Sequence, residues 1–234
     1  DLDMLHKTRG IALGYIRYRE TSIIAKIYTE AFGIQSYIVN GVRSSKSKTN
    51  KIALFQPLTM LDMVVYHKGK EDGLNRISEM KCYMPFSEIP YEISKLSIAL
   101  FITEMLSKTL HEEEHNEELF AFLNHSITYL DEAKDGFENF HIQFLMQFAT
   151  FLGFGIESME DLDRELNHHY FPRISDEIEM RAAEVLLRSR YGESMSLDRH
   201  RRVAILEKVL FFYQAHMTSL GTIRSLEVLK EIMN

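Results

Sequence analysis

The sequence of 234 residues predicts an α+β protein in which an N-terminal β-barrel precedes an α-helical domain. Apolar residues alternate with a period of two up to about residue 83, and after Pro85 they recur with helical spacing. The charge changes sign at the same place, because residues 1–83 carry a net charge of +5 and residues 84–234 carry −12. We therefore expect two domains, over residues 4–83 and 84–234.

Five segments of the first part read as strands. In residues 21–28 the alternation places Ile23, Ala25 and Ile27 on one face. The other candidates are residues 11–18, 35–42, 59–67 and 74–83, with turn signals at Gly33, Gly41, Pro57 and residues 68–73. Five short strands predict a small barrel of the oligonucleotide-binding (OB) type, since closing the sheet removes its exposed edges. An SH3-like barrel is the alternative.

The second part reads as helices. The clearest covers residues 140–152, where Phe140, Phe144 and Phe148 share one face and Gly153 follows as a stop signal. Another covers residues 203–217, and weaker patterns cover residues 92–110, 117–130, 178–187 and 223–233. Asp176, three residues before Glu179, is the expected N-cap of the helix at 178–187. We interpret the aromatic stripes as core and not as a cofactor site.

Composition excludes several classes of protein. Cys82 is the only cysteine, so no intrachain disulfide or multi-cysteine metal cluster can form, which is consistent with a reducing cytoplasm. The longest apolar stretches, near residues 98–102 and 209–213, are shorter than the roughly 20 residues of a membrane span. His6 and Lys7 interrupt the start, so we expect no signal peptide and no membrane association.

One motif formally matches the zinc-hydrolase pattern H-E-x-x-H. It comprises His111, Glu112 and His115, and it leaves a zinc metallohydrolase as an alternative function. The acidic flank and the position at a predicted helix end favour a solvated helix terminus instead. The sequence has no phosphate-binding loop, dinucleotide fingerprint or serine-hydrolase elbow, so those chemistries lack support.

The basic first part carries the candidate nucleic-acid contacts. The run from Arg43 to Lys51 includes Lys46 and Lys48 and contains no acid, so it attracts polyanions, although a solvated surface loop is the alternative reading. The candidate phosphate contacts are Arg9, Arg17, Lys26, Arg43, Lys46, Lys48 and Lys51. Tyr15, Tyr28 and Tyr37 offer rings on which bases could stack, or they fill the barrel.

The acidic second part has its own basic group. It comprises Arg188, Arg190, Arg199, Arg201 and Arg202. Arginine suits paired recognition of carboxylate or phosphate, so this group could bind an acidic peptide or nucleic acid. The alternative is that these arginines pair with acids of their own domain.

Several segments together resemble the bacterial recombination and repair mediator family RecO. In the first part they are TRGIAL at residues 8–13, YRETS at 18–22, YTEAFG at 28–33, NGVR at 40–43 and LFQP at 54–57. The FLGF sequence at 151–154 is similar to the family's helix end before its L-G-F turn, and SLEVL at 225–229 is similar to its C-terminal helix.

The resemblance implies a non-enzymatic function. Such a protein would bind single- and double-stranded DNA at the nucleoid and anneal strands. With RecR it would help to load RecA onto DNA coated by single-strand-binding protein, and the arginines from Arg188 to Arg202 would rim a pocket for that protein's acidic C-terminal tail. A module whose basic barrel docks an acidic protein partner is the rival.

Two departures from the family pattern stand out. Residues 155–171 hold no cysteine where many members have a four-cysteine zinc site, so we expect no metal and no cofactor. Asn40 replaces a residue that is often basic in the family, which removes one candidate phosphate contact.

Overall fold

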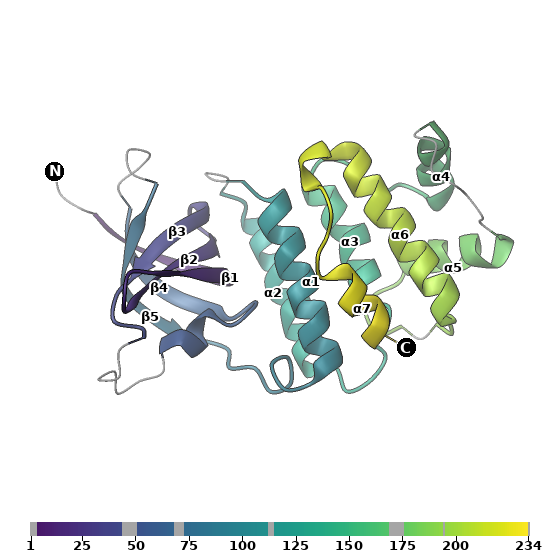
Figure 1. Cartoon of the computed structure of the whole chain (residues 1–234). Helices are drawn as coiled ribbons and strands as arrows, with labels where there is room; N and C mark the ends of the chain where they lie inside the picture. Colours follow the sequence, from purple (N-terminus) through teal and green to yellow (C-terminus); the bar gives the residue numbers. More distant parts are fainter. Residues whose placement is uncertain are drawn as a thin grey trace. The chain divides into compact units, whose positions relative to one another are not determined.

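The computed structural model describes residues 4–43, 51–67, 73–111, 115–168, 176–193 and 195–233. Strands form the N-terminal part and helices the rest (Figure 1), so the predicted α+β class is confirmed. The chain forms two compact units, Asp1–Ile127 and Thr128–Asn234, so the first unit includes helices as well as the barrel. The domain boundary at residue 83 stays a prediction.

The barrel consists of β1 (Leu5–Tyr18), β2 (Ser22–Thr29), β3 (Gly33–Val39), β4 (Met60–Tyr66) and β5 (Asn75–Cys82). It is closed in the order β1-β2-β3-β5-β4. Neighbouring strands are antiparallel except β3 and β5, which are parallel. A closed five-stranded barrel with this order confirms the predicted OB type.

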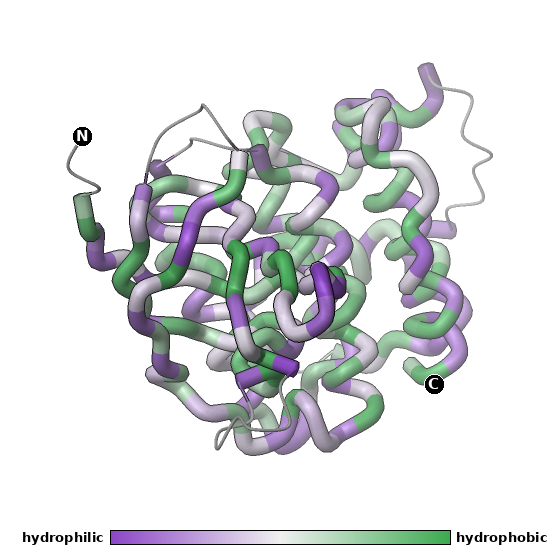
Figure 2. Tube along the Cα trace, turned by 60° about the vertical axis from the view of Figure 1, so that its left-hand side comes forward, coloured by the Kyte–Doolittle hydropathy of each residue, from purple (hydrophilic) through white to green (hydrophobic). Residues whose placement is uncertain are grey.

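The period-two pattern gives the barrel its inner face. Ile23, Ala25 and Ile27 are fully buried inside it, as the alternation predicts. Hydrophobic and hydrophilic residues follow one another along the strands in Figure 2. A short 3₁₀ helix, η1 (Lys51–Phe55), adds Phe55 to the same core.

β1 is longer than predicted because it pairs with two strands, β4 and β2. Its first half pairs with β4, its second half pairs with β2, and the register shifts between Ala12 and Gly14. Gly14 has a φ of 141°, which favours glycine at this irregularity. The sequence prediction began the strand at Ile11 because only the second half shows a clear apolar pattern.

The helices of the first unit are α1 (Ile93–Thr109) and α2 (Glu117–Glu132) up to Ile127. They lie where residues 92–110 and 117–130 were predicted to be helical. α1 is buried on most of its sides, and Ile98, Phe101 and Met105 are fully inaccessible. These residues are core, whereas Ile93 and Leu100 of the same helix are exposed.

The second unit contains α3 (Phe140–Phe151), α4 (Met159–His168), α5 (Glu177–Arg188), α6 (Arg199–His216), η2 (Thr218–Leu220) and α7 (Leu226–Ile232). α4 was not predicted. The side chain of Asp176 accepts a hydrogen bond from the Glu179 backbone amide at 2.6 Å, so the predicted N-cap of α5 is confirmed.

A buried ionic triad joins three helices of this unit. Lys208 Nζ on α6 lies 3.0 Å from Glu179 Oε1 on α5 and 3.2 Å from Asp163 Oδ1 on α4. All three residues are buried. Taking charges out of water is costly, so each member depends on the others for compensation.

We predict that Lys208→Met destabilises the protein by about 3–5 kcal/mol, because it leaves two buried carboxylates without their cation. Urea unfolding followed by circular dichroism measures the change. Combining it with Asp163→Asn and Glu179→Gln should recover much of the loss. Arg164→Met, which breaks exposed pairs on α4, serves as the control and should cost no more than about 1 kcal/mol. Equal losses in Lys208→Met and Arg164→Met would contradict the role given to the triad.

Candidate nucleic-acid interface

Helices of the first unit cover part of the outer face of β1, β2 and β3. Ile11, Tyr28 and Ile34 are neighbours in register on this face, yet all three are buried. The Tyr28 ring, only 2% exposed, stacks on Phe120 of α2 with ring centroids 6.2 Å apart. The prediction that Tyr28 stacks on bases is therefore wrong, because a helix already occupies its ring.

Tyr37 is also unavailable. Its side chain is fully inaccessible and belongs to the barrel core with Ile23 and Ala25. Burial raises the pKa of its hydroxyl. Tyr37 thus fills the barrel, the alternative that the sequence left open, and its prediction as a base contact is wrong.

Two predicted phosphate contacts have structural partners instead. Arg9 donates through Nε and Nη2 to the two carboxylate oxygens of Glu30, each at 2.9 Å, and its guanidinium lies 4.9 Å from the centroid of Phe120. This hydrogen-bonded pair lowers the pKa of Glu30. Lys26 Nζ donates to the Ser107 carbonyl oxygen of α1 at 3.1 Å. Both cations help to join the barrel to the helices.

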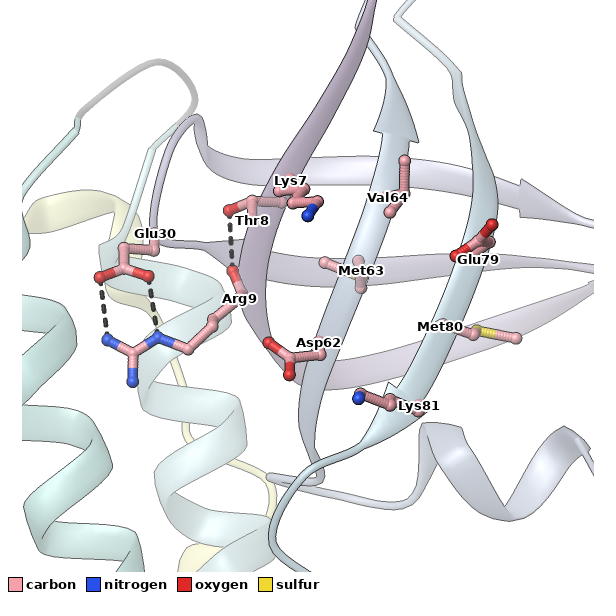
Figure 3. A pocket seen from close by; sticks show the side chains of 10 residues that line it. All are labelled: Lys7, Thr8, Arg9, Glu30, Asp62, Met63, Val64, Glu79, Met80 and Lys81. Atoms are coloured by element: carbon pink, nitrogen blue, oxygen red, sulfur yellow. Dashed lines mark hydrogen bonds and ion pairs between the residues drawn. The ribbon is translucent and has the colours of Figure 1, made fainter.

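The outer face of β1, β4 and β5 forms a charge-balanced pocket of about 520 Å³ (Figure 3). Its cations are Lys7, Arg9 and Lys81, and its acids are Glu30, Asp62 and Glu79. Asp62 lies between Arg9 and Lys81 in the strand register. Because the two signs balance, this pocket has no net attraction for a polyanion.

Cations gather at the β1–β2 turn. This turn cluster comprises Arg17, Arg19 and Arg43, and the backbone amide of Arg43 donates to the Thr21 carbonyl oxygen at 3.1 Å. Arg43 also donates to the carbonyl oxygen of Arg19 at 3.4 Å. Arg17 and Arg19 are exposed. The predicted residues Arg17 and Arg43 are thus brought to one end of the barrel, and Arg19 joins them.

A second cation-rich surface is the β5 groove, of about 740 Å³, between η1 and β5. Lys51, Arg76 and Lys81 line it, and Glu79 is its acidic residue. Arg76 and Lys81 were not predicted, although they lie at polar positions of the alternating segment 74–83. Asn40 is at its rim, where Ser22 Oγ donates to its Oδ1 at 2.8 Å. Lys46 and Lys48 lie outside the described residues.

An aliphatic row crosses the outer face near the turn cluster and the groove. Ile16, Ile24 and Ile38 are neighbours in register on β1, β2 and β3, and Arg76 follows on β5. Ile16 is 65% exposed. Tyr15, beside it, is 38% exposed, so its predicted base contact stays open.

Most of the helical arginines are engaged within their own unit. Arg188 pairs with Glu184 and donates to the Glu157 carbonyl oxygen. Arg202 donates to Asn139 Oδ1 and to the Leu197 carbonyl oxygen. Arg199 donates to the Lys230 carbonyl oxygen at 2.8 Å, and Arg190 is exposed.

Arg201 has a specific structural role, because it bridges two helix N-caps. Its guanidinium lies 3.0 Å from Asp176, the N-cap of α5, and 2.6 Å from Asp198, the N-cap of α6. Backbone amide hydrogen bonds, followed by the bonds from Arg201, lower the pKa of both carboxyls.

The zinc pattern lacks the helix that it requires. α1 ends at Thr109, so His111 lies beyond it, and His115 precedes α2. Nδ1 of His115 donates to the Glu30 carbonyl oxygen at 2.8 Å. Glu112 lies outside the described residues. No group of three or more potential ligands among the described histidines, cysteines and acids is placed to hold a metal ion.

In the described parts of the chain, no helix has the length and apolarity required to cross a bilayer.

An OB-type barrel with outward cations is typical of proteins that contact nucleic acids.

Comparisons with known proteins identify the family. The N-terminal model of recombination protein O matches residues 4–86, and the C-terminal model matches residues 90–218. A DNA repair protein RecO from Phocaeicola vulgatus is 38% identical over 99% of this chain and 100% of its own length. Those of Bacteroides fragilis and Flavobacterium psychrophilum are each 35% identical, over 99% and 97% of this chain and 100% and 99% of their own lengths. The chain belongs to the RecO family of DNA repair proteins.

We predict that Arg201→Gln lowers the melting temperature at neutral pH, because it removes the bridge between the two capping aspartates. Their depressed pKa values mean that this contribution is present above the ordinary carboxyl pKa and is lost as pH falls through the depressed values. The difference between wild type and variant should therefore shrink in acid. Thermal melts from neutral to acidic pH measure it, with the exposed Arg181→Gln as control. A difference that stays constant with pH would contradict the bridge.

Proposed function

We propose that this chain is a non-enzymatic mediator of recombinational repair that binds DNA through its barrel without sequence preference. Membership of a family of DNA repair proteins supports this function. The observation that carries it is the net positive charge of the β1–β2 turn, where the three arginines of the turn cluster are opposed by Glu20 alone among the described residues. This contrasts with the charge-balanced pocket on the same barrel.

The described cations at this interface would be Arg17, Arg19, Arg43 and Lys51. They are mostly arginines on exposed turns and a strand end, so they can follow a flexible phosphate backbone. Lys46 and Lys48 belong to the same basic run in the sequence and would add to it. Since two of the three candidate tyrosines are buried, phosphate charge would supply most of the affinity, for single and double strands alike.

The cellular role that fits this surface is strand annealing and the loading of RecA, together with RecR, onto DNA covered by single-strand-binding protein. A protein that works by holding DNA needs no catalytic group, and neither the turn cluster nor the groove presents a nucleophile paired with a base. We place this function at the nucleoid in the cytoplasm.

We predict that Arg17→Ala and Arg43→Ala each weaken binding of oligothymidylate. The slope of log K against log salt should become less negative by roughly 0.7 for each lost phosphate contact. Fluorescence anisotropy over a salt series measures it.

The matched control is Lys7→Ala, an exposed lysine of the charge-balanced pocket, which should leave the affinity and the slope unchanged. The triple variant of Lys46, Lys48 and Lys51 to alanine should flatten the slope further. If Arg17, Arg43 and Lys7 variants behave alike, the turn cluster is not the interface.

The helical arginine group remains our candidate receptor for the acidic tail of single-strand-binding protein. The acidic second part would repel such a tail unless cations are grouped locally. Arg190 and Arg199 are the exposed members whose side chains form no ion pair among the described residues, so they are the best candidates for the rim.

We predict that Arg190→Glu and Arg199→Glu both weaken binding of a labelled tail peptide. Arg190→Glu should do so without lowering the melting temperature, whereas Arg199→Glu also loses the hydrogen bond to the Lys230 carbonyl oxygen. Anisotropy measures the first effect and thermal unfolding the second. Arg181→Glu, on the exposed side of α5, is the control. Arg201→Glu is not a clean test, since it also breaks the bridge between the N-caps. Unchanged affinity in both rim variants would place the receptor elsewhere.

A further inference from the structure

The β5 groove contains a strand edge that the barrel does not pair. β3 ends at Val39, and its pairing with β5 stops at Ile38 and Arg76, whereas β5 continues to Cys82. Among the described residues, the strand pairing on this side of β5 stops at Arg76. Residues 77–82 therefore present an open edge toward η1.

The direction of the free backbone groups follows from the register. The Tyr83 amide donates to the Met60 carbonyl oxygen of β4 at 3.2 Å, so Tyr83 and, two residues earlier, Lys81 direct their backbone groups to β4. The backbone groups of Met80 and Cys82 consequently point to the open edge. Unpaired groups of this kind are a template for an added strand.

The walls of the groove define the chemistry of the added strand. Ile38, Leu54 and Ile77 are half-buried aliphatic side chains along it. Lys51, Arg76 and Lys81 are exposed cations around them, opposed by Glu79. An extended segment that alternates aliphatic and acidic side chains matches both features, because successive side chains of a strand point to opposite sides.

We propose that the β5 groove binds an extended acidic segment of a protein partner, which adds as a strand to the open edge of β5. This activity is additional to DNA binding at the turn cluster. A peptide is favoured over a nucleic acid because the edge presents carbonyl oxygens alternating with amides. A peptide backbone pairs with both kinds of group, whereas phosphates are repelled by the carbonyl oxygens.

The test uses the full chain and a blocked peptide of alternating valine and glutamate. Amide hydrogen exchange is followed by NMR for Met80 and Cys82, with Lys81, already paired to β4, as the internal reference. At a peptide concentration of about ten times Kd, exchange at Met80 and Cys82 should slow about tenfold, because about one tenth of the protein is free. Unchanged exchange at both amides would overturn the proposal.

Variants separate the groove from the DNA interface. Arg76→Glu should weaken binding of the acidic peptide, whereas the control Lys7→Glu should leave its affinity unchanged. A peptide of valine and lysine that binds equally well would refute the acidic specificity. If oligothymidylate slows hydrogen exchange at the Met80 and Cys82 amides and the acidic peptide does not, the groove is a nucleic-acid site instead. Loss of oligothymidylate binding in Arg17→Ala tests only the turn cluster and leaves this result independent.

Discussion

Two residue pairs, Tyr37 with Asn75 and Ile38 with Arg76, close the barrel, and the other properties of its surface follow from them. Closure fixes which side of every strand is inside, so Tyr37 becomes core and Ile38 and Arg76 become surface. Because this parallel contact is so short, β5 extends beyond β3. The same contact thus completes the core and leaves the groove beside η1 open.

Local patterns were enough to predict the strands, most of the helices and the N-cap at Asp176. α4 was missed because it is largely polar, although Met159, Leu162 and Leu166 have helical spacing and are buried. The covering of Tyr28 by Phe120 could not be predicted, since it joins segments far apart in the sequence. Tyrosine in a strand fits a barrel interior and a stacking surface equally well, and only the tertiary contacts decide between them.

Candidate site residues were harder to predict than the fold, because a cationic side chain can either pair with a group of its own chain or bind an external ligand. In the sequence, Arg9, Lys26 and Arg201 cannot be distinguished from Arg17. In the folded protein each of the three has a partner that is distant in the sequence. The structure separates the two uses by geometry. The first three join elements through their carboxylate or carbonyl partners. Arg17 lies exposed near the end of β1, where a ligand can reach it.

The proposed DNA interface and the proposed peptide groove share Lys51, and their ligands are both anionic. Arg76 is in register with Ile38, at the end of the aliphatic row that begins at Ile16 near the turn cluster. An acidic segment in the groove would neutralise Arg76 and Lys51, and so reduce the positive potential that phosphates experience nearby. Occupation of one site would therefore weaken the other, most strongly at low salt, where screening is least. Because such coupling is reciprocal, DNA at the interface would weaken binding of an acidic segment in the groove by the same factor.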